Sequence, residues 1–378
     1  MSNELRIALI GFGQLGRLHA YAWRSIPLLY APLAVRPRVT CVCDVDAERA
    51  QEGAEEAEAH HWSSDWEAVL ADPTIDAVDV CTPNAFHFDV VQAALKAHKH
   101  VYCEKPLGLD LGQAVGLRNL ALTSGVTHQI VSEYRYFPAL SRARELVSRN
   151  ALGQIYHFRG TYLHSGYVDP DRPLEWRLQR SVTGGGALMD LGPHLLDLAL
   201  MLAGPIESVV ASSATFITQR PVSHQSAERV PVDVEDALVL LLRFGNGALG
   251  TCELSRVATG SEDDLHFTVN GSRGALGFNL MDPNWLEFFD ATAAPDMRGV
   301  TRIATVQKYP APAVSPPPKC ALGYSRAHIA SQFAFLQAAV QGTPAEPDFR
   351  QGTAVQAVIH AAYESAASGR WTTVPNAL

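Results

Sequence analysis

The sequence predicts an α/β domain with a parallel sheet, followed by an α+β domain with an antiparallel sheet. With 378 residues the chain is longer than a typical domain with a single hydrophobic core, so two domains are expected. From residue 6 to about 150, short β-branched runs alternate with helix-like segments, a pattern typical of a parallel sheet covered on both faces. After Gly153, consecutive strand-like runs are joined by turns such as Gly245-Asn246-Gly247, which indicate antiparallel pairing.

The first half is predicted to alternate strands with helices. Strands are expected at Ile7–Ile10, Val39–Cys43, Ala77–Cys81, Val101–Cys103 and Gln129–Val131. Helices are expected at Leu15–Ser25, Ala47–Ala59, Asp65–Ala71, Phe86–Ala97, Leu111–Ser124 and Pro138–Ser148. The segment Pro27–Pro37 carries three prolines and is expected to be an inserted loop.

The second half is predicted to be mainly strands. These are expected at Ile155–Leu163, Val209–Thr218, Leu238–Phe244, Ala248–Leu254, His266–Val269 and Ala275–Asn279. One helix, Gly186–Ala203, is expected to interrupt them, and two more, Ala327–Gln341 and Phe349–Ser368, to close the chain.

Composition excludes several classes of protein. Hydrophobic residues make up 47% and charged residues 18%, which is a globular composition, and the net charge of -9 argues against binding to nucleic acid or an anionic membrane. No run approaches the roughly 18 apolar residues of a membrane helix, and the first residues, MSNELR, lack a signal-peptide pattern. The six cysteines are scattered without a CxxC pair. We therefore expect a cytoplasmic protein with reduced, buried cysteines and no nucleic-acid or membrane partner.

A glycine-rich turn after the first strand predicts a dinucleotide site. Residues Gly11-Phe12-Gly13-Gln14-Leu15-Gly16 form a G-x-G-x-x-G motif between a strand and a helix. Gly11 permits the tight turn, Gly13 lets the backbone approach a pyrophosphate, and Gly16 allows close helix–strand packing. The motif is weak evidence alone and strong evidence in this context. A Rossmann domain is therefore expected over residues 1–135.

Asp44 predicts NAD as the cofactor, with NADP less favoured. It ends the second strand, where a carboxylate binds the ribose 2′-hydroxyl and repels a 2′-phosphate. Asp46 is an alternative acid that can instead be the N-cap of the next helix, and Arg49 can in principle hold a phosphate.

Two later turns are expected at the carboxyl edge of the same sheet, where ligands of open α/β sheets bind. The first contains Thr82, Pro83, Asn84 and His87, although a histidine here is more often an exposed helix residue. The second is Glu104-Lys105-Pro106, in which Lys105 can polarise a substrate oxygen or simply form a surface salt bridge.

A second dense motif, Thr183 to Asp197, places Asp190 and His194 four residues apart. On one helix they share a face about 6 Å apart, which suits proton transfer by the imidazole. A metal pair is a weaker interpretation because HExxH is absent, so no metal is expected. A buried structural histidine is an equally weighted alternative.

Together these motifs resemble the Gfo/Idh/MocA family of nicotinamide-dependent oxidoreductases. GFGQLG, CTPNAFH, CEKPLG and GGGALMDLGPHLLD occur in the family's order and approximate spacing, between residue 6 and about residue 370. The resemblance implies a Rossmann domain and a substrate-binding and oligomerisation domain, residues 136–378, on a large open antiparallel sheet, whose last helices can pack back on the first domain. It also implies that Lys105, Asp190 and His194 are catalytic.

The segment from His157 to Arg177 is most similar to the branch that contains levoglucosan dehydrogenase and related sugar-oxidising enzymes. In that branch a Trp-Arg pair lies near the cofactor, so Trp176 and Arg177 are candidate cofactor contacts. Asp44 is a departure, because not every member of the branch carries an acid there.

The resemblance implies oxidation of a secondary hydroxyl of a sugar, glycoside, anhydrosugar or cyclic polyol to the ketone. Candidate substrate contacts are Lys105, Tyr134, Tyr162, His164, Asp190, His194 and Tyr324. One alternative is an NAD-dependent glycosidase acting by transient oxidation. The other is a non-catalytic nucleotide- or sugar-sensing protein, against which the retained Lys105, Asp190 and His194 argue. A homodimer or homotetramer is expected through the C-terminal sheet, because another subunit usually covers an exposed apolar face.

Overall fold

The computed structural model describes residues 4–317, 319–321 and 323–376. The chain divides into two compact units. Unit 1 comprises residues 1–136 and 307–353, and unit 2 comprises residues 137–306 and 354–378.

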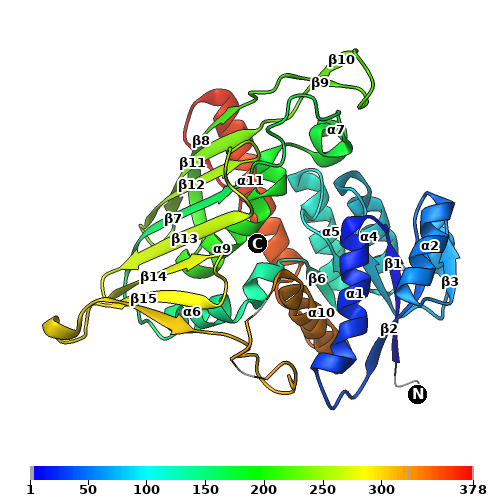
Figure 1. The fold of residues 1–378 in the computed structure, drawn as a ribbon, viewed down its shortest axis with the longest axis horizontal. Helices are drawn as coiled ribbons and strands as arrows, with labels where there is room; N and C mark the ends of the chain where they lie inside the picture. Colours follow the sequence, from blue (N-terminus) through cyan, green and yellow to red (C-terminus); the bar gives the residue numbers. More distant parts are fainter. Residues whose placement is uncertain (1–3, 318, 322, 377–378) are drawn as a thin grey trace. The chain divides into compact units, whose positions relative to one another are not determined.

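Unit 1 contains a six-stranded parallel sheet, as predicted (Figure 1). Its strands are β1 (Glu4–Ile10), β2 (Arg36–Cys43), β3 (His61–Ser63), β4 (Ala77–Val80), β5 (His100–Cys103) and β6 (His128–Ile130). The order is β3-β2-β1-β4-β5-β6, and every pair is parallel. The strand order reverses between β1 and β4, so their carboxyl ends define the switch point where such sheets bind ligands.

Helices cover both faces of this sheet. They are α1 (Gln14–Leu29), α2 (Ala47–Ala57), α3 (Trp66–Ala71), α4 (His87–Lys96), α5 (Leu111–Ser124) and α10 (Tyr324–Gln341), with short 3-10 turns η1 (Asn84–Phe86) and η2 (Glu133–Tyr136). Alternate strand residues enter two cores. Ile7 and Leu9 pack with α1, α2 and α10, whereas Ala8 and Ile10 pack with α3, α4 and α5.

The loop predicted at Pro27–Pro37 is shorter than expected. Helix α1 continues through Pro27 to Leu29, and β2 already begins at Arg36. A proline this close to the end of a helix removes one hydrogen bond, and the buried Trp23 and Ile26 keep the last turn packed on the core.

Unit 2 is built on a nine-stranded sheet in the order β16-β15-β14-β13-β7-β12-β11-β8-β17. The strands are β7 (Ile155–Leu163), β8 (Ile206–Ala214), β11 (Ala237–Phe244), β12 (Leu249–Ser255), β13 (Asp264–Gly271), β14 (Gly274–Asn279), β15 (Trp285–Asp290), β16 (Val300–Ala304) and β17 (Thr372–Thr373). A separate ribbon joins β9 (Gln219–Pro221) to β10 (Arg229–Pro231). The sheet is mixed and largely antiparallel, because β7 lies between β13 and β12 and is parallel to β12.

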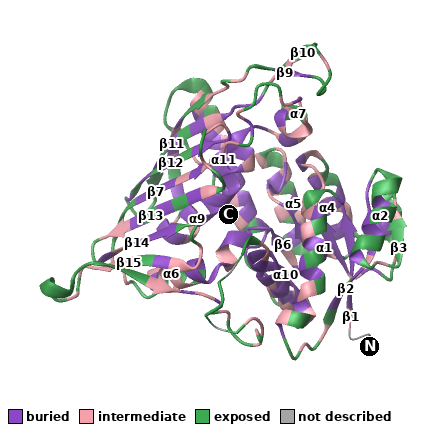
Figure 2. Ribbon diagram, in the orientation of Figure 1, coloured by how far each residue is buried: buried purple, intermediate pink, exposed green. Residues whose placement is uncertain are grey.

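One face of this sheet is buried and the other is open (Figure 2). Along β11, buried and exposed residues alternate, as expected for a sheet with one solvated face. Helices α6 (Pro138–Ser148) and α9 (Gly192–Ala203) pack against its strands. The other helical segments are η3 (Trp176–Leu178), α7 (Arg180–Thr183), α8 (Ala187–Asp190), η4 (Pro295–Met297) and α11 (Phe349–Ser368), which begins in unit 1.

The single helix predicted over Gly186–Ala203 is wrong. The structure divides it into α8 and α9, and the arms Arg180–Asp190 and Gly192–Ala203 meet at 46°. Pro193 has no N–H to donate to the carbonyl of Met189 and its ring crowds that turn, which explains the break. Asp190 therefore ends one helix, and His194 lies in the first turn of the next.

Within the described residues, no single helix is long and apolar enough to cross a membrane, and only the bent pair just described passes such a test jointly. All six cysteines are free, but Cys320 is exposed, unlike the buried positions expected.

Candidate functional site

The glycine turn has the geometry that a dinucleotide needs. Gly11 has φ +93°, and a Cβ on it would lie 2.7 Å from the Cys81 backbone. A Cβ on Gly16 would lie 2.3 Å from the Gly11 carbonyl oxygen, so helix and turn pack closely there. A Cβ on Gly13 would meet nothing within 4 Å, so this backbone is open to a phosphate. These residues fit a bound dinucleotide, with a pyrophosphate against Gly13 and the start of α1.

The other residues of the turn differ in exposure. Gln14 is exposed and Leu15 half-buried. Phe12 is fully buried, and its ring lies where a Cβ on Gly53 would stand. Phe12 can therefore offer only its backbone to a cofactor.

Asp44 is buried and anchors the glycine turn. One carboxylate oxygen, Oδ2, accepts a hydrogen bond from the Phe12 amide at 2.8 Å. The other, Oδ1, accepts from the Asp46 amide at 3.1 Å and lies 3.3 Å from Arg49 Nη1. Asp46 caps α2 by accepting from the Arg49 amide, so the N-cap alternative for Asp46 is correct.

The turn after β4 is held by a buried histidine. The two ring nitrogens of His87 lie 2.7 Å from the Pro106 carbonyl oxygen and 2.9 Å from that of Thr82. His87 is fully buried, so the expectation of an exposed helix residue is wrong, and burial lowers its pKa. Pro83 leads into η1 and Asn84 is buried. Thr82 Oγ1 is buried without a hydrogen-bond partner among the described residues.

Lys105 follows the carboxyl end of β5 and is half-buried. Its amide donates to Oε2 of the buried Glu104 at 3.1 Å, and His87 contacts the following residue, Pro106. The interpretation of this turn as a surface salt bridge is therefore wrong for Glu104, whose carboxylate points into the protein.

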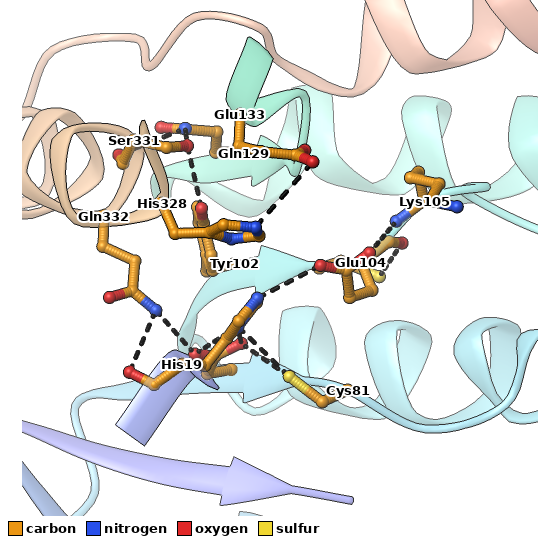
Figure 3. Close-up of polar contacts among 12 residues, drawn as sticks. His19, Cys81, Tyr102, Glu104, Lys105, Gln129, Glu133, His328, Ser331 and Gln332 are labelled. Carbon is orange, nitrogen blue, oxygen red and sulfur yellow. Dashed lines mark hydrogen bonds and ion pairs between the residues drawn. The ribbon is translucent and has the colours of Figure 1, made fainter. Parts of the chain in front are cut away.

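Sequence reasoning missed the buried polar cluster behind Lys105 (Figure 3). His19 of α1 lies between Asp79 of β4 and Glu104, and Glu133 lies 3.8 Å from His328 of α10. One signal was available: Asp79 is a carboxylate inside an apolar run, which requires a buried partner.

Two predicted substrate contacts also belong to unit 1. Tyr134 is buried, Tyr324 is 43% exposed, and their rings lie 6.5 Å apart. Their contact with a substrate stays a prediction.

In unit 2, Glu235 fixes the start of the helix that carries Asp190. This buried carboxylate accepts from the amides of Gly186 at 3.0 Å and Leu188 at 2.9 Å. It thereby caps α8, and Gly186 has no room for a side chain, because a Cβ would lie 1.9 Å from the Glu235 carbonyl oxygen. Close packing against Glu235 therefore explains why a glycine precedes the helix that carries Asp190.

Aromatic and polar side chains surround Asp190 and His194. The Tyr162 ring stands edge-on to the His194 ring, with centroids 5.9 Å apart, and its hydroxyl donates to Asp263 at 2.7 Å. Burial lowers the pKa of His164, partly offset by the charge of Asp190. Burial and the same carboxylate raise the pKa of Tyr167, which sequence reasoning did not single out.

Trp176 and Arg177 form a separate pair in η3. The Arg177 guanidinium lies 4.2 Å from the centre of the Trp176 ring, and Arg256 donates to the Arg177 carbonyl oxygen at 3.1 Å. Their contact with a cofactor stays a prediction.

One group of potential metal ligands occurs in the described part of the chain: His19, Asp79 and Cys81, with ligand atoms within 4.8 Å of one another. It lies inside the buried cluster and shares no residue with the predicted catalytic set.

Comparisons with known proteins agree with this architecture. Residues 5–132 match the oxidoreductase family with an NAD-binding Rossmann fold, and residues 140–277 match the GFO/IDH/MocA C-terminal domain. The levoglucosan dehydrogenase of Pseudarthrobacter phenanthrenivorans is 32% identical over 99% of both chains. The D-glucoside 3-dehydrogenase of Escherichia coli is 30% identical over 97% of both.

Solved structures give the same picture. A levoglucosan dehydrogenase in complex with NADH and levoglucosan superposes with a TM-score of 0.94 at 33% identity, covering 99% of this chain and all of the other. An oxidoreductase domain protein from Kribbella flavida covers both chains completely with a TM-score of 0.95 at 36% identity. The chain therefore belongs to the Gfo/Idh/MocA family of oxidoreductases, with an NAD-binding Rossmann domain at its amino terminus.

Proposed function

We propose that this enzyme oxidises a secondary hydroxyl of a sugar, glycoside, anhydrosugar or cyclic polyol to the ketone, with NAD as cofactor. The observation that carries the proposal is the joint presence of Lys105, Asp190 and His194 in a chain similar over almost its whole length to sugar dehydrogenases. Hydrogen bonds fix the elements that carry two of them: Glu104 and His87 hold the turn of Lys105, and Glu235 holds the start of the helix that ends at Asp190.

The three residues have distinct tasks in this proposal. His194 accepts the proton of the hydroxyl, and the adjacent Tyr162 orients its ring. Lys105 hydrogen-bonds the same oxygen and stabilises the negative charge that develops on it. Asp190 accepts a hydrogen bond from a neighbouring hydroxyl and so orients the substrate. A bound nicotinamide would supply the acceptor for the hydride that leaves the substrate carbon.

The cofactor would be held by the glycine turn, Asp44 and the turn from Thr82 to His87. NAD is favoured over NADP because Asp44 places a buried carboxylate beside the turn. Arg49 is paired with both Asp44 and Asp46, at 3.3 and 3.4 Å, and would have to leave them to bind a 2′-phosphate.

The test is a panel of sugars, glycosides, anhydrosugars and inositols, each supplied with NAD and followed by the absorbance of reduced nicotinamide. The proposal expects net reduction with at least one secondary alcohol. Release of a free sugar without net reduction would identify the glycosidase alternative. Binding of nucleotide or sugar without turnover of any compound would identify the sensor.

A further inference from the structure

A fully buried histidine of unit 1 contacts two carboxylates at once (Figure 3). His19 lies on α1, three residues after Gly16, and has no exposed surface. Its Nδ1 lies 3.0 and 3.1 Å from the two oxygens of Asp79, and its Nε2 lies 3.1 Å from Glu104 Oε1. Neither carboxylate belongs to the same element as His19.

This geometry suits a protonated ring. Ionised carboxylates only accept hydrogen bonds, so both ring nitrogens must donate, which only the imidazolium can do. Burial alone lowers the pKa of His19, but the charge and hydrogen bonds of Asp79 outweigh it, so the pKa lies well above its usual value. The ring is therefore a fixed positive charge inside the unit.

Asp79 is well satisfied by neighbours other than His19. Trp23 Nε1 donates to its Oδ2 at 2.7 Å, and Gln332 Nε2 lies 3.5 Å from the same oxygen. The Cys81 thiol lies 3.5 Å from Oδ1, and burial raises the pKa of that thiol. His19 can therefore direct its second ring proton to Glu104.

Glu104 connects His19 to Lys105. Its Oε1 faces His19, and its Oε2 accepts from the Lys105 amide at 3.1 Å. Burial raises the pKa of Glu104, but the hydrogen bond and charge of His19 outweigh it and hold the pKa well below its usual range. A protonated Glu104 would lose its charge-assisted hold on that amide.

We propose that His19 is a positioning residue for Lys105: its imidazolium keeps Glu104 ionised, and the Glu104 carboxylate fixes the backbone from which Lys105 reaches the substrate. The inference rests on the proposed function, because it assumes that Lys105 contacts the reacting oxygen.

The same atoms form the group of potential metal ligands named above. Asp79 Oδ2 already accepts a hydrogen bond from Trp23 at 2.7 Å, whereas Oδ1 lies 3.0 Å from His19 Nδ1 and 3.5 Å from Cys81 Sγ. A metal would replace the proton on which the proposal depends, so metal content is part of the test.

The groups that face His19 set the expected pH dependence. They are Asp79 and Cys81 at the end of β4, Tyr102 and Glu104 of the β5 region, and His328 of α10, whose ring centre lies 5.5 Å away. Glu133 repels Glu104 only when it is ionised, on the basic side, and burial lowers the pKa of His328, so that residue stays neutral. On the acid side, His19 is therefore the main cation that keeps the pKa of Glu104 low, and the charge of Lys105 adds a smaller effect.

The decisive experiment compares pH profiles of kcat/KM. Glutamine in His19→Gln donates from one nitrogen only and carries no charge, so Glu104 gains a proton within the working range. We expect kcat to fall at least tenfold, KM for NAD to change less than threefold, and a new loss of activity to appear towards acid pH. The double variant His19→Gln/Glu104→Gln has no carboxylate to protonate, so it should lack the new acid limb. His61→Gln, on the exposed strand β3, is the matched control and should behave like the wild type.

The outcomes separate the two proposals. If Lys105→Met keeps wild-type turnover, the proposed function fails. If Lys105→Met is inactive but His19→Gln keeps the wild-type kcat and pH profile, the role of His19 fails. An acid limb that persists in the double variant, or a lower melting temperature with an unchanged pH profile, also overturns it.

A measurement on the unaltered enzyme covers the case in which His19→Gln does not fold. Histidine labelled with ¹⁵N should show one imidazole that keeps both ring protons at about pH 8, as expected for a ring held between two carboxylates. Absence of such a signal, or a stoichiometric transition metal in the purified protein, would overturn the proposal.

Discussion

Lys105 and His194 are the residues whose substitution separates chemistry from cofactor binding. Lys105→Met is expected to abolish most turnover while NAD binding persists, because the glycine turn and Asp44 are untouched. His194→Ala should lower kcat by about 10²–10⁴-fold if it removes a general base. Steady-state kinetics measures the turnover of both variants, and a fluorescence titration measures their NAD binding. An unchanged rate with a lower melting temperature would show that His194 is structural.

Asp44 has two roles that a single substitution can distinguish. Asp44→Ser removes the negative charge near the ribose site, so the preference for NAD over NADP in kcat/KM should narrow, chiefly through better use of NADP. It also removes the carboxylate that would accept a hydrogen bond from the ribose 2′-hydroxyl, so NAD binding should weaken by about 1.5–3 kcal/mol at most. A wild type that prefers NADP, with no change in the variant, would contradict the assignment.

Glu133 predicts a pH-dependent stability. Burial and repulsion by Glu104 raise its pKa to about 8. The carboxyl group of Glu133 therefore stays protonated up to a higher pH in the folded protein than in the unfolded chain. Stability from this group is complete below the unfolded value of about 4.5 and is lost as pH rises through about 8. Glu133→Gln should therefore raise the melting temperature more at about pH 8.5 than at about pH 5. Glu55→Gln, on the exposed side of α2, should show no such trend.

Among the elements, α8 depends on a contact that only glycine allows. In Gly186→Ala the new Cβ would meet the Glu235 backbone, which cannot rotate away, so α8 must shift. We expect a loss of about 1–3 kcal/mol in unfolding free energy, the usual cost of overpacking, and a lower kcat because Asp190 moves with the helix. Gly299→Ala, whose Cβ meets nothing within 4 Å, is the control for denaturant unfolding. Equal stability of the two variants would contradict the prediction.

Most elements can be predicted from the sequence because apolar periodicity is a local property. Strand pairing is not local, and the prediction fails where it depends on such pairing. The strands of unit 1 from Ile7 to Ile130 were found, but the three residues of β3 carry no pattern of their own. Pro193 marks the break between α8 and α9, but the apolar run around it favours one continuous helix. The parallel pairing of β7 with β12 could not be foreseen, since His157 and Leu249 are far apart in the chain.

The candidate site shows the same division. The glycines, Asp44 and Lys105 can be identified from sequence motifs. The residues that hold them in place can be identified only from the three-dimensional structure. His19, Asp79 and Glu104 come from three elements, and no spacing in the sequence relates them. Buried charges that satisfy one another are thus the least predictable part of the site.

At the scale of the whole molecule, the open face of the unit 2 sheet exposes apolar side chains that no other part of the chain covers among the described residues. Val239 and Leu241 of β11 and Leu249 of β12 point outward and are 50%, 46% and 52% exposed. Neighbouring apolar side chains on a sheet face favour burial against another subunit, so we propose a homodimer or homotetramer through this face. Light scattering after size-exclusion chromatography should give a dimer or tetramer for the wild type. Val239→Lys/Leu241→Lys should shift it towards monomer, because two charges would be desolvated at the contact. Leu122→Lys replaces an equally exposed leucine on α5 and should leave the assembly intact. A monomeric wild type, or a double variant of unchanged mass, would mean that this face is solvated in the working enzyme.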